Sequence, residues 1–374
     1  MRHNSGRLRR MLAIAVVGAG LSGLALADRL LESHRNIAVF EARGRCGGRI
    51  LSHMLNPPST RDEVTVDLGP TWVWPGQQPR IAALAKRLGL ELFRQWDQGH
   101  SLYQAGPNAM PQMFTDTETH ADAWRIKGGC GQLVAGLAHG LPDPMLHLQH
   151  QLLRLTDCGT HIGLEFKTGQ GLAHYQARQV VLAVPPRLLA DSVMFEPALA
   201  PNLRQLMKDT PTWMAGHAKA LLVYREAFWR RQGYSGNAWL HYPGTVLAEV
   251  YDACPAHGES AALFGFFGLP SALRASHRDH LEAWTVQQLA RLFGAEAAHP
   301  LQAIIQDWSA ETFTATRHDQ MPPASHPAYG HRPLRLDHWQ DKLYFCGTET
   351  AQTHGGYLEG ALEASERVFT ALTL

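Results

Sequence analysis

Three glycines with a fixed spacing follow the first apolar segment of the chain, where they could hold a phosphate. Residues 18–23 read G-A-G-L-S-G. Gly18 permits a tight turn, Gly20 lets the backbone approach a pyrophosphate, and Gly23 lets a helix pack closely against a strand. Glu41 follows 18 residues after Gly23 and could accept hydrogen bonds from ribose hydroxyls. The pattern predicts a dinucleotide-binding site, and by itself it does not distinguish NAD from FAD.

The elements that must position these residues lie on both sides of the glycines. Residues 12–17 are a short apolar run typical of a strand buried on both faces, and residues 37–40 are a second such run. Between the two runs, leucines recur with mostly helical spacing to about Glu32. Phosphates are favoured at a helix N-terminus, because free N–H groups and the helix dipole attract anions there. We therefore expect a β-α-β unit.

The stretch that begins at Glu41 favours FAD over NAD as the cofactor. Residues 41–50 read E-A-R-G-R-C-G-G-R-I, which resembles the E-A-x-x-R-x-G-G-R signature of the flavin amine oxidase superfamily. The resemblance implies a bound FAD whose diphosphate lies against the two-glycine turn, with Arg45 and Arg49 neutralising its charge. The alternative reading of this stretch is an exposed basic loop.

Other segments resemble the same family along nearly the whole chain. Residues 67–72 (D-L-G-P-T-W) resemble a segment near the isoalloxazine ring, and Leu152 matches a position whose main chain reaches the adenine end. Residues 346–351 (C-G-T-E-T-A) and 354–361 (H-G-G-Y-L-E-G-A) resemble a C-terminal element of the monoamine oxidases. A helix N-terminus aimed at the flavin N1–C2 carbonyl edge would stabilise the negative charge of the reduced ring.

The resemblance also implies which side chains take part in the chemistry. Lys219 matches a lysine that holds a water against flavin N5, and Tyr357 matches one wall of an aromatic cage that orients the amine. Trp308, in a W-x-x-E-x-F segment, is expected as a pocket wall. The second cage position falls near His318, which could be a polar wall or a proton acceptor. A surface lysine, a core tyrosine and a surface histidine are the alternatives.

The sequence departs from the family pattern in two informative places. No cysteine lies between residues 255 and 345, where the monoamine oxidases carry their covalent flavin. We therefore expect non-covalent FAD, the alternative being a linkage at another residue. The amino-acid oxidases have a G-x-M-R element whose arginine grips the substrate carboxylate, whereas residues 69–72 here read G-P-T-W. We therefore expect a substrate amine without an α-carboxylate.

The expected cofactor-binding residues all lie in the segments matched above. They are Gly18, Gly20, Ser22, Gly23, Glu41, Arg43, Arg45, Gly48, Arg49, Gly69, Pro70, Thr71, Trp72, Leu152, Gly347, Thr348, Glu349, Gly356, Tyr357 and Leu358. The expected catalytic-site residues are Lys219, Tyr357, Trp308 and His318. No metal site is expected, because the 21 histidines show no clear ligand spacing.

Length and composition suit a protein of two domains. The chain has 374 residues, of which 45% are hydrophobic and 18% charged. The fold class that we expect is α/β, with a Rossmann-like FAD-binding domain joined to an α+β substrate domain built on a mixed sheet. The FAD-binding domain should comprise 11–75, 125–187 and 335–374, and the substrate domain 76–124 and 188–334, with the active site between them. Residues 1–10 are expected to form a basic, disordered tail.

Charge, cysteines and apolar runs limit the classes of partner. A net charge of +1 gives no electrostatic reason to expect binding of nucleic acid. Five widely spaced cysteines argue against a disulfide framework and favour a reducing, cytoplasmic compartment. The N-terminal segment is basic and then apolar, as in a secretory signal peptide. Removal of such a peptide would destroy the glycine turn, which argues against this reading. No other run reaches about 18 apolar residues, so no membrane span is expected. The oligomeric state is left open.

The expected reaction is oxidation of a small-molecule amine. A hydride passes from the α-carbon to flavin N5, the imine product is released, and O2 or another acceptor reoxidises the flavin, with hydrogen peroxide formed from O2. One alternative is a flavin desaturase or dehydrogenase that acts on C–C bonds with an acceptor other than O2. A second is a flavin-binding fold kept as a non-catalytic interaction module.

Overall fold

The chain folds into two compact units in a computed structural model that describes residues 11–373, apart from 34–35, 56–63, 117 and 258–259. The first unit comprises the chain up to Gly48, residues 134–212 and the chain from Ser325 onward. The second unit comprises residues 49–133 and 213–324. The tail expected at residues 1–10 lies outside the described residues.

The first unit is built on an eight-stranded sheet. Its strands are β1 (Leu12–Val17), β2 (Ile37–Phe40), β9 (Leu146–His147), β10 (Gln151–Asp157), β11 (Ile162–Thr168), β12 (Gly171–Leu182), β13 (Met194–Glu196) and β19 (Leu343–Phe345). Their order is β13-β10-β11-β12-β1-β2-β9, and β19 also pairs with β12. The pairs β1–β2, β1–β12, β2–β9 and β12–β19 are parallel, whereas β11 runs antiparallel to β10 and β12.

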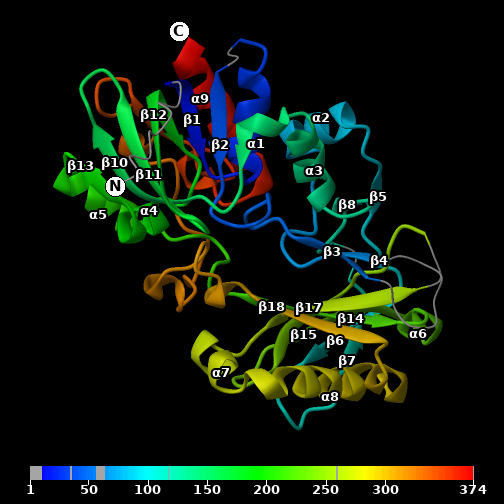
Figure 1. Ribbon diagram of the computed structural model, residues 1–374. Coiled ribbons are helices and arrows are strands. Elements are labelled where there is room, and N and C mark those ends of the chain that lie inside the picture. Colours follow the sequence, from blue (N-terminus) through cyan, green and yellow to red (C-terminus); the bar gives the residue numbers. More distant parts are fainter. Residues whose placement is uncertain (1–10, 34–35, 56–63, 117, 258–259, 374) are drawn as a thin grey trace. The chain divides into compact units, whose positions relative to one another are not determined.

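Helices flank this sheet. They are α1 (Leu21–Leu30), α4 (Pro186–Ser192), α5 (Pro201–Asp209) and α9 (Leu358–Thr373), with short 3-10 turns η1 (Asp143–Met145), η6 (Arg332–Leu334) and η7 (Thr348–Thr350). The helices α1 and α9 pack against one another beside β1 (Figure 1). The β1-α1-β2 unit therefore has its expected strand boundaries, and its parallel pairing gives the Rossmann-like arrangement.

The second unit is built on a seven-stranded mixed sheet of order β18-β14-β17-β16-β15-β6-β7. These strands are β6 (His100–Gln104), β7 (Gln112–Phe114), β14 (Ala218–Tyr224), β15 (Tyr234–Leu240), β16 (Leu247–Asp252), β17 (Ala261–Phe267) and β18 (Gln302–Asp307). All neighbouring strands are antiparallel except β15 and β6. Two strand pairs lie outside the sheet: β3 (Ser52–Leu55) with β4 (Val64–Asp67), and β5 (Leu92–Arg94) with β8 (Trp124–Ile126).

The two faces of this second sheet are covered differently. Helix α8 (Leu281–Phe293) lies along one face, where Leu289 and Phe293 join a buried cluster with side chains of β14 and β17 (Figure 1). On the other face, Val64 and Val66 of β4 pack against Leu221 and other side chains of the sheet. This packing of β4 is why residues 49–75 cluster with the second unit, although we expected them in the FAD-binding domain.

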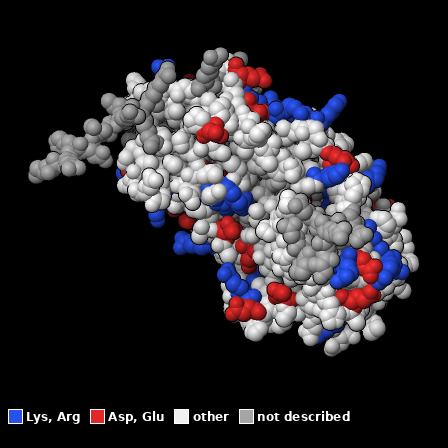
Figure 2. All heavy atoms as spheres, turned by 45° about the vertical axis from the view of Figure 1, so that its right-hand side comes forward, with Lys and Arg blue, Asp and Glu red and all other residues white. Residues whose placement is uncertain are grey.

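The remaining described helices have nine residues or fewer. They are α2 (Pro79–Arg87), α3 (Gly131–His139), α6 (Phe228–Arg231) and α7 (Ser271–Ser276), with 3-10 turns η2 (Arg278–His280), η3 (Ala295–Ala298), η4 (Trp308–Ala310) and η5 (Arg317–Asp319). In the described part of the chain, no helix is both long and apolar enough to cross a bilayer. Basic and acidic side chains are interspersed among uncharged ones on the face shown in Figure 2, in keeping with a net charge of +1.

Candidate functional site

The glycine turn after β1 has one face that the protein leaves open. Gly18 has φ of 104°, and a Cβ there would lie 2.6 Å from the carbonyl oxygen of Ala183. A Cβ at Gly23 would overlap the carbonyl oxygen of Gly18, so α1 can pack closely only with glycine at this position. A Cβ at Gly20, in contrast, would meet nothing within 4 Å. The space over Gly20 is therefore available for a group that approaches the backbone, as a pyrophosphate does.

A second glycine turn lies beside the first. Gly20 and Gly47 form a parallel bridge, and the Gly47 N–H donates to the Ala19 carbonyl oxygen at 2.8 Å. Gly48 has φ of 56°, which glycine adopts without strain. Two segments that are far apart in the sequence thus present adjacent backbone at the N-terminus of α1. Such backbone suits a diphosphate that needs several N–H donors.

Acidic and basic side chains hold the two turns together. The buried Glu41 carboxylate accepts hydrogen bonds from the Ala19 and Arg43 N–H groups, each at 2.9 Å. The Arg45 guanidinium donates to the carbonyl oxygens of Cys46 and Gly48, each at 3.1 Å. Glu41 is placed at the end of β2, as expected. Here its carboxylate orders the loop, and a ribose hydroxyl would have to share or replace these backbone partners.

The C-terminal element joins the same unit at the start of α9. The Ser22 hydroxyl donates to the Cys346 carbonyl oxygen, which ties α1 to the segment after β19. The Thr348 hydroxyl accepts from the Gly356 N–H at 3.0 Å and donates to the Tyr357 carbonyl oxygen at 2.9 Å. Gly356 has φ of 85°. The turn delivers Tyr357, whose side chain is 39% exposed, immediately before the first residue of α9.

Other expected cofactor residues of the first unit lie in or near its core. Leu152 is buried at an irregularity in the pairing of β10 with β11. Gly347 immediately precedes η7, and Thr348 and the fully buried Glu349 are its first two residues. Leu358 is the first residue of α9. These positions agree with the expected elements, while their contacts with FAD stay predictions.

In the second unit, Lys219 is a buried amine near the start of β14. Its Nζ donates to the Thr71 hydroxyl at 2.6 Å and to the Gly69 carbonyl oxygen at 3.2 Å. The same atom lies 3.9 Å from the centre of the Phe264 ring. Lys219 is 2% exposed, and burial lowers its pKa from 10.5 to about 7. A lysine so placed can gain or lose a proton near neutral pH.

A buried carboxylate, that of Asp67, lies near this amine and interacts with it electrostatically. The buried Asp67 carboxylate accepts from the Ser52 hydroxyl at 2.5 Å and from the Cys130 N–H at 2.9 Å. Burial raises the pKa of Asp67, whereas the nearby charges of Lys219 and Arg125 oppose that rise. For Lys219 the Asp67 charge in turn opposes the effect of burial. The two groups are thus electrostatically linked, although each is driven toward its neutral form by burial.

Tryptophans fix the segment that carries these partners. The Trp308 indole N–H donates to the Leu68 carbonyl oxygen at 3.0 Å, and the Trp72 indole N–H donates to the Gln95 side chain at 2.9 Å. Trp308 follows Asp307, which forms an ion pair at 2.8 Å with the buried Arg274. Trp308 is 6% exposed. It acts on residues 68–71 through the backbone, which makes it a positioning residue in this unit.

The other expected residues of this segment, Arg49, Gly69, Pro70 and Thr71, also lie in the second unit. A Cβ at Gly69 would overlap the Arg49 carbonyl oxygen, so glycine is required there by the protein itself. The Arg49 guanidinium donates to the Trp213 carbonyl oxygen at 3.2 Å. Pro70, partly buried, and the buried Thr71 complete the segment over Lys219.

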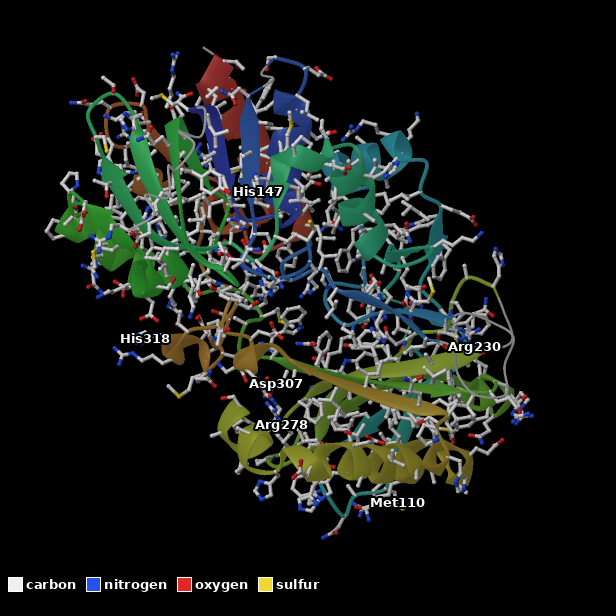
Figure 3. All side chains as sticks on the ribbon, in the orientation of Figure 1. Met110, His147, Arg230, Arg278, Asp307 and His318 are labelled. Carbon is white, nitrogen blue, oxygen red and sulfur yellow. The ribbon has the colours of Figure 1, made fainter. Side chains whose placement is uncertain are left out.

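His318, the expected cage residue, and His326 have different surroundings. His318 lies in η5 and is exposed, and its side chain points outward from that turn (Figure 3). In the first unit, the ring stacked on Tyr357 is that of His326, with centroids 5.0 Å apart and planes 7° apart. Tyr329 packs edge-on against the same imidazole at 5.5 Å. His326 is therefore an aromatic neighbour of Tyr357 within the first unit, and the role expected for His318 stays a prediction.

A further histidine was not anticipated at the expected ribose end of the first unit. His147 closes β9, and its ring stacks on Phe40 at 4.9 Å (Figure 3). Its carbonyl oxygen accepts from the Glu41 N–H at 2.9 Å. The sequence gives little indication of this strand, because two residues are too few to show an alternation of buried and exposed side chains. Among the described residues, no three His, Cys, Asp or Glu side chains are arranged to hold a metal ion.

Comparison with protein families gives one matching model. The model of the flavin-containing amine oxidoreductases matches residues 21–106 and 103–371. Among curated proteins, the chain is 24% identical to flavin-containing amine oxidase A of Equus caballus, and the match covers 96% of this chain and 84% of that protein. It is 25% identical to flavin-containing amine oxidase B of Sus scrofa, over 95% and 84%.

Solved structures share the fold. Cyclohexylamine oxidase from Brevibacterium oxydans matches with a TM-score of 0.79 at 20% identity, covering 97% of this chain and 98% of that one. Wild-type putrescine oxidase bound to putrescine matches with a TM-score of 0.77 at 20% identity, over 96% and 98%. The open face of Gly20 fits the pyrophosphate of a dinucleotide such as FAD. The chain belongs to the family of flavin-containing amine oxidoreductases and is a flavin-dependent enzyme with FAD as its cofactor.

Proposed function

We propose that this enzyme oxidises a small amine without an α-carboxylate, holds FAD non-covalently and returns the electrons to O2. Bound FAD supplies the two-electron acceptor for the hydride of the amine α-carbon. The protein supplies position, desolvation and proton control. The curated relatives are named as flavin-containing amine oxidases, and two structural relatives are named for cyclohexylamine and putrescine, neither of which carries a carboxylate.

The observation that carries the proposal is the buried amine of Lys219. Its two hydrogen-bond partners, Gly69 and Thr71, belong to the segment that resembles the ring-facing segment of the family. Because its pKa is near 7, Lys219 can carry a positive charge or release it at neutral pH. A cation in a dry site stabilises negative charge that develops close to it. Lys219 is therefore our choice for the residue that supports flavin reduction and reaction with O2.

The cofactor is held, in this proposal, by backbone more than by side chains. Gly20 and Gly48 offer open backbone to the diphosphate, and Glu41 receives the ribose hydroxyls. The N-terminal turn of α9, which begins after Tyr357, directs its N–H groups toward the polar edge of the ring. Ser22 acts indirectly, because its hydroxyl ties α1 to Cys346.

The substrate amine is recognised by aromatic faces. The ring of Tyr357 is partly exposed, and His326 lies parallel to it. Aromatic faces attract groups with cationic character and orient a small amine without forming an ion pair. Residues 69–72 contain no arginine, so the side chain that grips a carboxylate in the amino-acid oxidases has no counterpart in that segment.

Anaerobic mixing of the purified holoenzyme with matched amines and amino acids tests this function. Primary amines should bleach the visible flavin band, and air should restore it with release of peroxide, while the corresponding α-amino acids should leave the band unchanged. Acid precipitation should leave the FAD in the supernatant, because no covalent bond holds it. Bleaching by amino acids alone, or flavin that stays with the precipitate, would refute the corresponding part of the proposal.

A further inference from the structure

A row of side chains crosses the second sheet on the face that carries Lys219. The strand register pairs Lys219 of β14 with Phe266 of β17, and Phe266 with Glu249 of β16. Glu249 pairs in turn with Trp239 of β15. Directly paired residues of neighbouring strands point to the same face of a sheet. The lysine, a phenylalanine, a carboxylate and a tryptophan therefore follow one another across this face.

Aromatic rings surround the carboxylate in this row. Phe266 and Trp239 are its cross-strand neighbours, and Tyr251 lies two residues further along β16, on the same face. The ring of Tyr251 is 6.0 Å from that of Trp239 and 6.4 Å from that of Phe266. We call Glu249, Trp239, Tyr251 and Phe266 the Glu249 cluster. Of these side chains Tyr251 is buried, while the other three are partly exposed.

The carboxylate of this cluster has one strong partner. The Tyr251 hydroxyl donates to Glu249 at 2.8 Å and so fixes the orientation of the carboxylate. Among the described residues, no lysine, arginine or histidine side chain forms an ion pair with Glu249. A cation that arrived between these rings would gain both the carboxylate and the aromatic faces.

We propose that Glu249 binds a second ammonium group of the substrate, at the end remote from the carbon that is oxidised, so that the enzyme prefers diamines and longer polyamines to monoamines. This inference rests on the proposed amine oxidation and names its substrate class. One strand, β17, separates the Glu249 and Lys219 strands, so the two Cα atoms lie about 10 Å apart at the usual strand spacing. Phe266 lies between them and offers its ring to the methylene chain of such a substrate.

The same geometry argues against Glu249 as a partner of the reacting amine. Hydride loss from the α-carbon needs the neutral amine, because its lone pair stabilises the forming imine. A carboxylate in contact with that amine would hold it in the protonated form. Glu249 is separated from Lys219 by a full strand, so it can hold a remote ammonium as a cation and leave the reacting nitrogen free to lose its proton.

The test compares matched pairs of substrates on the holoenzyme and its Glu249→Gln variant. Diaminopentane and diaminohexane are compared with pentylamine and hexylamine, by the rate of anaerobic flavin bleaching as a function of amine concentration. We expect the wild type to require less diamine than monoamine for half-maximal rate. In Glu249→Gln the diamine concentration that gives half-maximal rate should rise at least about tenfold. The limiting rate with diamine should change little, and so should both quantities for the monoamines. Glu249→Asp should recover part of the preference.

Glu226→Gln is the matched control. It removes the same charge from the second unit, at an exposed residue paired with Arg231, and should leave the preference for diamines intact. Equal use of diamine and monoamine by the wild type would overturn the inference, as would an equal loss for both substrates in Glu249→Gln. Thermal unfolding of each variant shows whether a loss of diamine preference comes from misfolding. If Glu249→Gln is misfolded, Glu249→Asp is compared with the wild type instead.

A binding measurement separates this inference from the proposed function. Calorimetric titration with a hexane-linked bis-trimethylammonium ion, which has two fixed charges and no N–H group, reports on the remote site without turnover. Binding that is tighter than that of hexyltrimethylammonium, and that weakens in Glu249→Gln, supports the Glu249 site even if no amine bleaches the flavin. Equal binding of the two ions by the wild type would refute it even if amine oxidation is confirmed.

Discussion

Replacement of Lys219 by methionine should change how the stability of the protein depends on pH. Burial lowers the pKa of this amine from 10.5 to about 7 in the folded protein. Between these two values the unfolded chain holds a proton that the folded chain has released. Stability therefore rises with pH over this window, and the cost of the buried charge is fully present below about pH 7.

The size of the effect follows from the two pKa values. One pH unit corresponds to about 1.4 kcal/mol, so a fall from 10.5 to about 7 amounts to roughly 4–5 kcal/mol. Methionine has a similar length and no charge, but it also gives up the hydrogen bonds to Gly69 and Thr71, which costs about 1–3 kcal/mol. Lys219→Met should thus be more stable than the wild type at about pH 6 and should lose that advantage by about pH 10.

Urea unfolding at a series of pH values, followed by tryptophan fluorescence, measures this difference. Lys127→Met is the control, because Lys127 is 48% exposed and pairs with Glu91 at the surface. Its stability difference from the wild type should vary little between about pH 7 and pH 10. If Lys219→Met and the wild type show parallel stability curves over that window, Lys219 titrates normally and the electrostatic basis of its proposed role is wrong.

The remaining predictions concern the cofactor cradle, the aromatic pair and the proton that accompanies reduction. Gly20→Ala should fold normally and bind FAD at least about tenfold more weakly in titrations of the apoprotein, whereas Gly23→Ala should lower the unfolding temperature, because its Cβ meets backbone. His326→Ala should raise the amine concentration for half-maximal bleaching more than His318→Ala does; the reverse result would favour His318 as the cage residue. Anaerobic reduction near pH 8 should take up a proton, measured with an indicator dye, that Lys219→Met does not take up.

The sequence was most informative where a repeating pattern and a motif coincide. The strands at 12–17 and 37–40 have the expected boundaries, because continuous apolar runs between turn residues leave little choice. The final helix begins at Leu358, inside the 354–361 motif, and the residues before it form a turn. His354 and Gly356 have φ of 52° and 85°, and such residues cannot belong to a right-handed helix.

Longer strands and loops were harder to predict, for different reasons. Strand β12 extends from Gly171 to Leu182, but only its last residues form a continuous apolar run, and the preceding residues alternate between polar and buried ones. His326 lies in a stretch without regular structure, where spacing along the chain does not predict which ring faces which. Glu249 was not singled out from the sequence because its proposed role depends on strand register, and pairing partners such as Phe266 are distant in sequence.

The buried pair of Asp67 and Lys219 explains why a lysine is kept in so costly a position. Burial is the largest influence on both groups, raising the pKa of the carboxyl and lowering that of the amine, while their mutual attraction works against both shifts. Lys219 is therefore near its midpoint at neutral pH, where a small electrostatic change alters its protonation most. In the proposed function, negative charge on the reduced flavin would raise the pKa of this amine, so Lys219 would take up a proton on reduction and release it on reoxidation. A surface lysine, with its pKa far above neutral, would stay protonated throughout and could not couple the two transfers.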